Sequence, residues 1–208
     1  AFYDLKVAPI SFDFLWFLVG ADYTRRQLGL ARIDVTIVAG PHDGVREEEP
    51  DYELAVDTAA RRLRVDNMLV PACGLLPTVA NLTIAGDRGE AVRTRTLLAR
   101  HVYPKGYEPA LPTYHHPSEC IRASREEGAD IAVLRAQEGA LRAVDRWLAA
   151  HAGGRRPVVI TLRHYGYMPA RNSNLAAWAA FAGRLDARVY CPIIIPDADQ
   201  TLDGLPAD

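Results

Sequence analysis

The sequence predicts an α/β fold with a mainly parallel sheet and helices on both of its faces. Short runs rich in Val and Ile recur along the chain, helical patterns lie between them, and polar loops follow several of the runs. Regular alternation of strand and helix is typical of parallel sheets covered on both faces. We therefore expect a Rossmann-like architecture, followed by the start of a second Rossmann-like unit.

The predicted strands are short and apolar, and each is bounded by Gly, Pro or polar residues. Their β-branched content favours extended structure over helix. They comprise residues 3–7, 33–39, 81–85, 158–162 and 189–195.

Helical patterns occupy residues 14–28, 53–69 and 88–100. A longer one spans residues 130–152 and stops at Gly153-Gly154, since glycine commonly ends helices. In the last predicted helix the apolar residues recur at three- and four-residue spacing and share one face. These residues are Leu175, Trp178, Phe181, Ala182 and Leu185.

Three segments follow from this order of elements. Residues 1–128 form a Rossmann-like unit, although the Pro-rich stretch 108–128 holds no convincing strand and serves as a connection. Residues 129–154 form a connecting helix, and residues 155–208 the first βαβ of a second unit. Two strands and one helix bury too little surface to stand alone, so we expect this second unit to be incomplete.

The composition bears on which partners and which cellular location to expect. The 208 residues are 49% hydrophobic and 24% charged, with a formal charge of -2 and a pI near 6.3. Such a balance gives no electrostatic reason to expect nucleic acid as a partner. The apolar run 12–21 is about half the ~20 residues that a membrane-spanning helix needs. We expect a cytoplasmic protein.

Neither a disulfide framework nor a metal site is predicted. Cys73, Cys120 and Cys191 are odd in number and widely spaced. His115 and His116 lie near Cys120, but adjacent histidines rarely point at one ion and no second ligand pair follows.

Ligands of open α/β sheets bind beyond the carboxyl ends of the strands, so the loops there are candidate sites. After the first strand, Ser11 or Asp13 can either cap the next helix or face a cleft. After the second, His42 beside Asp43 can supply a general base, and the same Gly-Pro-His-Asp-Gly run also suits a plain surface turn. No GxGxxG fingerprint follows the first strand, which disfavours a classical dinucleotide site.

The loop after the fourth strand carries the strongest signal. Arg163 and Arg171 bracket it, and Asn172, Ser173 and Asn174 can open a helix whose free N–H groups bind anions. These residues therefore predict a phosphate site. The competing interpretation is that the small polar residues only cap the helix while the arginines are solvated.

Two further groups fit a nucleotide-linked sugar at the same edge. Tyr165, with His164 and Tyr167, offers planar stacking beside the arginines. Asp197 ends the fifth strand and can accept a hydrogen bond from a sugar or ribose hydroxyl.

Residues 160–163 (Ile-Thr-Leu-Arg), 171–174 (Arg-Asn-Ser-Asn) and 195–197 (Ile-Pro-Asp), with Trp178 and Phe181, resemble those of the two-Rossmann (GT-B) glycosyltransferases, more narrowly the bacterial polysaccharide-associated members. The resemblance implies that the N-terminal unit binds the acceptor and the C-terminal unit the nucleotide-sugar. It places Arg163 and the 171–174 loop at the donor diphosphate. Asp13, His42 and Asp43 would then face the acceptor.

The function implied is sugar transfer from a nucleotide-sugar to a glycan or lipid-linked acceptor, and the second acceptor type leaves room for peripheral membrane association. In an inverting reaction His42 or Asp43 would deprotonate the acceptor hydroxyl, without metal or further cofactor. Two alternatives stay open: a nucleotide-sugar epimerase on the same scaffold, and a non-catalytic nucleotide- or glycan-binding module.

Overall fold

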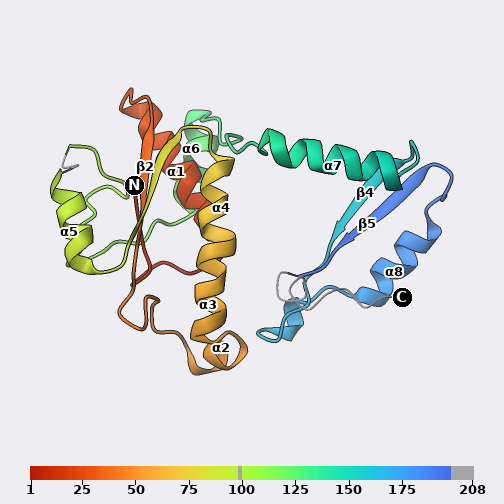
Figure 1. Cartoon of the computed structure of the whole chain (residues 1–208), viewed down its shortest axis with the longest axis horizontal. Helices are drawn as coiled ribbons and strands as arrows, with labels where there is room; N and C mark the ends of the chain where they lie inside the picture. Colours follow the sequence, from red (N-terminus) through yellow and green to blue (C-terminus); the bar gives the residue numbers. More distant parts are fainter. Residues whose placement is uncertain (98–99, 198–208) are drawn as a thin grey trace. The chain divides into compact units, whose positions relative to one another are not determined.

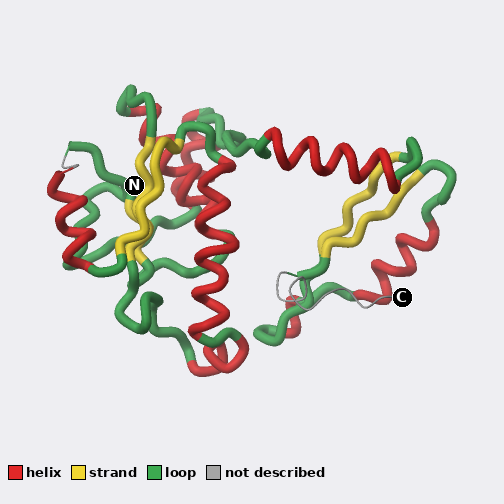
Figure 2. The backbone as a smooth tube through the Cα atoms, in the orientation of Figure 1, coloured by secondary structure: helices red, strands yellow, loops and turns green. Residues whose placement is uncertain are grey.

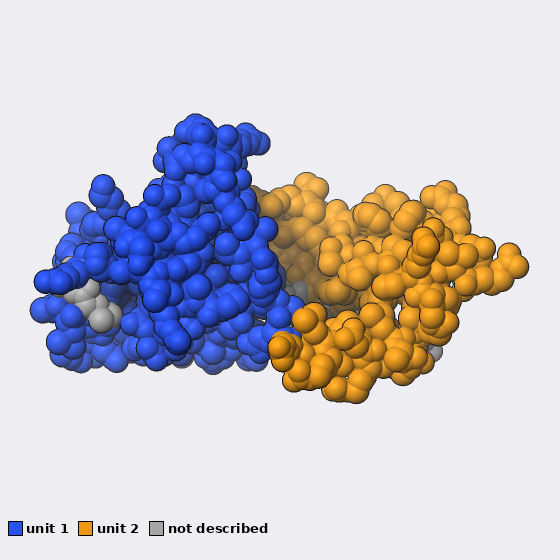
Figure 3. Space-filling model, turned by 90° about the horizontal axis from the view of Figure 1, so that it is seen from above, with its two compact units in different colours: residues 1–137 blue, residues 138–208 orange. Residues whose placement is uncertain are grey.

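The chain folds into two compact units, shown in blue and orange in Figure 3. The computed structural model describes residues 1–97 and 100–197. The first unit comprises Ala1–Gln137 and the second Glu138–Asp208.

The first unit is built on a parallel three-stranded sheet. Its strands are β1 (Phe2–Asp4), β2 (Ile33–Val38) and β3 (Val79–Ala85), in the order β1-β2-β3. They lie side by side in Figure 2, and the registers pair Tyr3 with Ile37 and Ile37 with Ile84. The predicted α/β fold with a mainly parallel sheet is therefore confirmed.

Helices cover both faces of this sheet (Figure 1). One face packs against α1 (Asp13–Gln27) and against a helical rod that runs from α3 (Thr58–Arg64) to α4 (Val70–Ala72) through the π-helical turn η1 (Val65–Leu69). The opposite face packs against α5 (Arg88–Leu97). Two faces arise because successive strand residues point to opposite sides.

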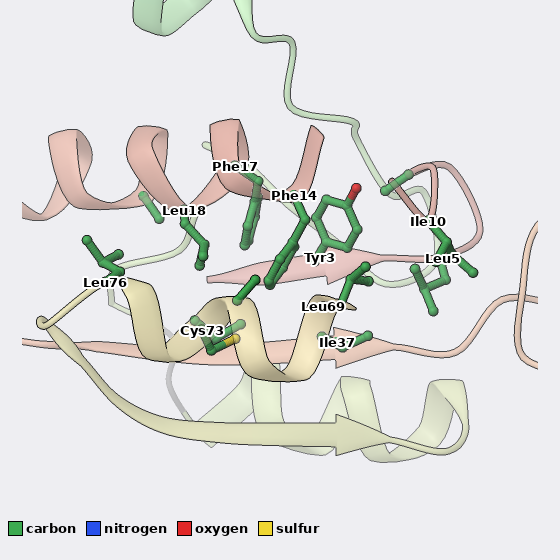
Figure 4. Packing of buried hydrophobic residues seen from close by; sticks show 14 of the residues in the cluster. Tyr3, Leu5, Ile10, Phe14, Phe17, Leu18, Ile37, Leu69, Cys73 and Leu76 are labelled. Carbon is green, nitrogen blue, oxygen red and sulfur yellow. The ribbon is translucent and has the colours of Figure 1, made fainter. Parts of the chain in front are cut away.

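The larger core lies between the sheet and the face formed by α1 and α4 (Figure 4). Tyr3 of β1 contacts the rings of Phe14 and Phe17 edge-on, with centroids 4.7 and 5.0 Å apart. Leu69 fills the same layer from the rod and is fully buried. On the other face Phe2 stacks on Tyr107 at 4.7 Å. Edge-to-face and offset rings add about 0.5–1.5 kcal/mol per pair beyond their burial.

The helical pattern at residues 53–69 is broken where a single helix was expected. A short helix, α2 (Pro50–Ala55), ends before Val56, whose side chain is buried. Asp57 then starts α3 by accepting a hydrogen bond from the backbone N–H of Ala60 at 2.7 Å. Asp57 thus lies between α2 and α3 and caps the start of α3, a position that Asp favours. The rod continues past residue 69 to η2 (Cys73–Leu75).

The segment predicted as a plain connection contains a helix, α6 (Ser118–Glu127), which ends at Gly128 with a left-handed φ of 67°. The prediction missed it because three prolines precede it and its periodic stretch is short. The long helix predicted from residue 130 starts only at Glu138, as α7 (Glu138–His151). Val133 and Leu134 instead pack against the core of the first unit, and the N–H of Arg135 donates to the carbonyl of Leu75 at 2.7 Å.

The second unit places β4 (Arg156–Thr161) parallel to β5 (Tyr190–Ile195), joined through the 3₁₀ turn η3 (Pro169–Arg171) and α8 (Leu175–Arg184). Its described core is thin. Val159 and Ile194 remain 57% and 50% exposed, and neither α7 nor α8 has a buried residue. Among the described helices, none has the length and apolar character to cross a membrane.

Candidate functional site

The order in which the chain's segments lie across the sheet reverses at β1: β2 and then β3 lie on one side of it, and the segment after α5 lies on the other. After α5 the chain returns to the free side of β1, where the N–H of Phe2 donates to the carbonyl of Tyr103 at 2.8 Å. Residue 103 therefore lies beside β1, on the side away from β2, although it forms no strand. In open α/β sheets this reversal point is where ligands bind, beyond the carboxyl ends of the strands. Residues that follow β1, β2 and Tyr103 are accordingly the candidates in the first unit.

At the end of β1 a buried carboxylate organises this edge. Asp4, whose side chain is fully buried, pairs with Arg88 through two contacts, Nη1 to Oδ1 at 3.0 Å and Nη2 to Oδ2 at 2.6 Å. The hydroxyl of Tyr107 donates to the same carboxylate at 2.6 Å, and Arg88 also donates to the carbonyl of Pro109. Burial and the Asp4 hydrogen bond raise the pKa of Tyr107. The network ties β1, the start of α5 and the 107–109 segment together.

Sequence reasoning overlooked this network. A signal was present, because an acidic residue inside an apolar strand must find a partner when it is buried. Asp4 lies within the first predicted strand, and Arg88 opens a predicted helix at the carboxyl edge of the sheet. Asp4 and Arg88 both have hydrogen-bond partners within the network. The network therefore positions this edge of the sheet and leaves few polar groups for a ligand.

Asp13 lies at the first residue of α1. Its Oδ2 accepts from the hydroxyl of Ser11 at 2.8 Å, and the Asp13 N–H donates to that hydroxyl oxygen at 3.2 Å. Ser11 thus bonds to the first residue of α1, but Phe12 is the N-cap and no side chain caps the helix, so the predicted capping role is not confirmed. The carboxylate lies close enough to Tyr114 to raise the pKa of its hydroxyl, after the larger effect of burial, and Arg46 opposes this. Asp13, Tyr114 and Arg46 therefore form one group at the carboxyl edge.

His42 and Asp43 lie in a tight turn after β2. Gly40 pairs with Gly44 and His42 with Val45 in antiparallel bridges, and Asp43 adopts a left-handed φ of 52°. Nε2 of His42 lies 3.6 Å from Glu47, and the Asp43 carboxylate lies 3.5 Å from Arg62. The two side chains have separate partners and are well exposed. The turn geometry accounts for the residue types, and a role as general base stays a prediction.

In the second unit, the small polar residues after β4 hold the loop in shape. The hydroxyl of Ser173 accepts from the N–H of Arg163 at 2.9 Å, and the Ser173 N–H donates to the Arg163 carbonyl at 2.8 Å. Asn172 bonds both the N–H and the carbonyl of Tyr165, at 3.1 and 3.0 Å. Asn174 caps α8 by accepting from the N–H of Ala177 at 3.0 Å. The side chains of Asn172, Ser173 and Asn174 are thus engaged within the protein.

The guanidinium of Arg163 lies inside this loop. Its Nη2 donates to the carbonyl of Tyr167 at 3.2 Å, and its Cζ lies over the ring of Tyr165, 5.2 Å from the centroid. The Nε atom is buried and has no hydrogen-bond partner among the described residues. A buried donor without a partner is uncommon and is disfavoured by about 1–3 kcal/mol. Arg163 therefore keeps one N–H donor that no described residue satisfies, as do Arg26 and Arg61.

Two other predicted residues reach the same loop. Oδ2 of Asp197, directly after β5, accepts from the N–H of His164 at 3.0 Å, so the ends of the parallel strands do bring Asp197 to the loop that begins at Arg163. Arg171 is exposed, and among the described residues its guanidinium makes one long contact, 3.9 Å from Nη1 to the sulfur of Met168. Arg171 lies three residues before Asn174, the residue that caps α8.

A buried polar cluster lies under α1, away from these loops. His115 contacts the hydroxyl of Tyr103 through Nδ1, and its Nε2 lies 3.8 Å from the sulfur of Cys120. Burial, with a smaller contribution from His116, lowers the pKa of His115 to about 4, and burial raises that of Cys120 to about 11. The imidazole is therefore neutral and the thiol protonated near pH 7, which suits packing better than nucleophilic chemistry.

The described residues contain no group of three or more His, Cys, Asp or Glu side chains arranged to hold a metal ion. Comparisons of the chain with protein-family models, with curated proteins and with solved structures found no match. Any functional conclusion therefore depends on the residues and geometry given above.

Proposed function

We propose that this chain is a nucleotide-sugar-dependent glycosyltransferase, or part of one, that transfers a sugar to a hydroxyl of a glycan or lipid-linked acceptor. The observation that carries the proposal is the loop after β4, where the Nε atom of Arg163 is buried without a partner among residues 1–97 and 100–197. Arg171 and the start of α8 lie on the same loop. These are the groups that a diphosphate requires.

In the proposed donor site, the two arginines hold the diphosphate, and the N-terminal end of α8 adds its partial positive charge. Tyr165, under the Arg163 guanidinium, offers an aromatic face to the sugar or base. Asp197, which lies directly after β5 and reaches the N–H of His164, contacts a ribose or sugar hydroxyl in this site. Asn172, Ser173 and Asn174 contribute by fixing the loop.

In the proposed reaction, the acceptor oxygen forms a bond to the anomeric carbon while the bond from that carbon to the diphosphate oxygen breaks. The acceptor proton passes to a general base, and the arginines stabilise the negative charge on the leaving diphosphate. Asp13 is one candidate for this base, because it opens α1 in the loop after β1. His42 and Asp43 remain the alternatives.

Product analysis tests this function. The chain is incubated with each nucleotide-sugar and a mixture of glycan acceptors, and nucleoside diphosphate release and glycosylated acceptor are followed by mass spectrometry. Release that is abolished in Asp13→Asn, and unchanged in the exposed-residue control Asp66→Asn, supports transfer with Asp13 as base. A sugar altered while still on the nucleotide would instead identify an epimerase.

The second candidate is a non-catalytic nucleotide-binding module. It is favoured by the turn at residues 40–45, where His42 and Asp43 are occupied by Glu47 and Arg62 as ordinary exposed pairs. Tight nucleotide-sugar binding without release or alteration of the sugar, for every acceptor tried, would select this module over the transferase.

A further inference from the structure

A second candidate site lies at the opposite edge of the same sheet. A pocket of about 530 Å³ opens at the amino ends of β1 and β2. It is bounded by the last turns of α1, by residues 30–34 and by residues on either side of positions 98–99. Volumes of about 300–1,000 Å³ are typical of small-molecule sites. The pocket shares no lining residue with the loops proposed above for donor and acceptor.

The inner wall of the pocket is apolar. Phe2, Ala21 and Ile33 are all at least nine-tenths buried and contribute to its lining. Leu28 stands at the mouth and is 47% exposed. An apolar group of a ligand would therefore lose contact with water here, at about 25 cal/mol for each Å² that it buries.

The rim of the pocket is basic. Arg32, Arg100 and His101 line it, and within residues 1–97 and 100–197 none of the three side chains forms a hydrogen bond or ion pair. The other lining arginine, Arg25, is engaged by Asp22 at 2.8 Å and by the carbonyl of Leu30 at 2.6 Å.

One lining carboxylate opposes this charge. Among the residues that line the pocket, Asp34 is the one with an acidic side chain, and its carboxylate accepts a hydrogen bond from Asn81 at 2.7 Å. Arg32 and Arg100, which have no partner among the described residues, therefore give the mouth of the pocket more positive charge than Asp34 cancels. An apolar wall below a basic rim matches a ligand with an apolar body and an anionic head.

We propose that this pocket binds a small amphiphilic anion, an aliphatic or aromatic group that ends in a carboxylate or a phosphate. The apolar body occupies the wall formed by Phe2, Ala21 and Ile33. The head lies between Arg32 and Arg100. The site is separate from the donor loop and does not depend on the function proposed for it.

The ligand class is tested by calorimetric titration of the whole chain with octanoate, octyl phosphate, octanol and inorganic phosphate. We expect octanoate or octyl phosphate to bind at least tenfold more tightly than octanol and than inorganic phosphate. The better of the two anions identifies the head group. Equal binding of octanol and the anions, or no binding of either anion, would overturn the proposal.

Variants place the ligand in the pocket. Arg32→Gln with Arg100→Gln is expected to weaken anion binding at least tenfold, whereas Arg93→Gln, an exposed arginine of α5 outside the pocket, leaves it unchanged. Thr24→Trp fills the pocket from its half-buried rim and is expected to abolish binding while the circular dichroism spectrum stays unchanged. Binding that survives in both the double variant and Thr24→Trp would contradict this location.

A competition experiment separates this site from the donor loop. The anion is titrated again in the presence of a saturating nucleotide-sugar, or of saturating nucleoside diphosphate if no donor binds. Unchanged anion affinity supports two sites. Displacement by the nucleotide would mean that the anion occupies the donor loop, and it would refute the pocket at the amino edge.

Discussion

Arg163 and Ser173 exchange two hydrogen bonds across the loop that follows β4, one through the Ser173 hydroxyl at 2.9 Å and one between backbone groups at 2.8 Å. The loop is thereby closed at its base. Because the backbone of Arg163 is held at both its N–H and its carbonyl, its guanidinium is positioned before any ligand arrives. Such preorganisation reduces the entropy lost on binding.

Removing the hydroxyl should loosen this closure. In Ser173→Ala the Arg163 N–H loses its partner, and we expect a loss of about 1 kcal/mol in the stability of the loop. The backbone amide of Arg163 should then exchange with deuterium several-fold faster in NMR experiments. Asn174→Ala is the matched control, since it removes a cap from α8 and leaves the Arg163 amide bonded. An equal acceleration in both variants would show general fraying of the unit.

The ion pair between Asp4 and Arg88 should contribute strongly to the first unit. In Asp4→Ala, Arg88 and the Tyr107 hydroxyl lose their shared carboxylate at a fully buried position, and we expect a loss of about 3 kcal/mol in the free energy of unfolding. Glu126→Ala breaks the exposed pair with Arg122 and should lower it by less than about 1 kcal/mol. Urea denaturation of the first unit compares the two. Similar small losses would show that the buried network is energetically unimportant.

The buried histidine predicts an acid-sensitive fold. His115 has a pKa of about 4 in the folded protein against 6.5 when exposed, so the unfolded chain binds the proton more readily between these values. Stability is therefore complete above about pH 6.5 and falls as the pH drops toward 4. The full difference is about 3 kcal/mol at 1.36 kcal/mol per unit. The groups around the imidazole are Tyr103, Cys120, His116 and, 3.9 Å away, Glu119.

Urea denaturation of the first unit between pH 7 and pH 4 measures this loss. His115→Gln should flatten the pH dependence, because the ionisable group is gone. His116→Gln, at an exposed position, should keep it nearly intact. A slope unchanged by His115→Gln would assign the acid sensitivity to carboxylates elsewhere.

The sheet was predictable from sequence, because each strand is a short β-branched run whose neighbours along the chain are helices. All five predicted strands exist, and no strand end is shifted by more than three residues, the largest shift being that of residues 3–7 against Phe2–Asp4. The observed end of a strand differs from the predicted one where a side chain forms a contact with a distant part of the chain. The first strand ends at Asp4 because that carboxylate turns to Arg88 and to the N–H of Lys6.

Elements that depend on distant contacts could not be read from periodicity. Leu134 fits a helical face with Leu141, yet it packs on the core of the first unit outside any helix or strand, so α7 starts later than its pattern suggests. In the candidate site, the sequence placed Arg163 and Asp197 at one edge, and the structure brings Asp197 to the N–H of His164. The sequence could not predict that Ser173 bonds to Arg163 or that the Nε atom of Arg163 is buried, because residue spacing does not determine hydrogen-bond partners.

The central claim is that Arg163 binds the diphosphate of a nucleotide-sugar, and isothermal titration of the chain with UDP-, GDP-, ADP- and CMP-sugars tests it most directly. We predict that one nucleotide binds selectively and that Arg163→Ala weakens it at least tenfold. Arg156→Ala, an exposed arginine at the other end of β4, should leave the affinity unchanged. Equal affinity in wild type and Arg163→Ala, or no binding of any donor by the folded wild-type chain, would contradict the account.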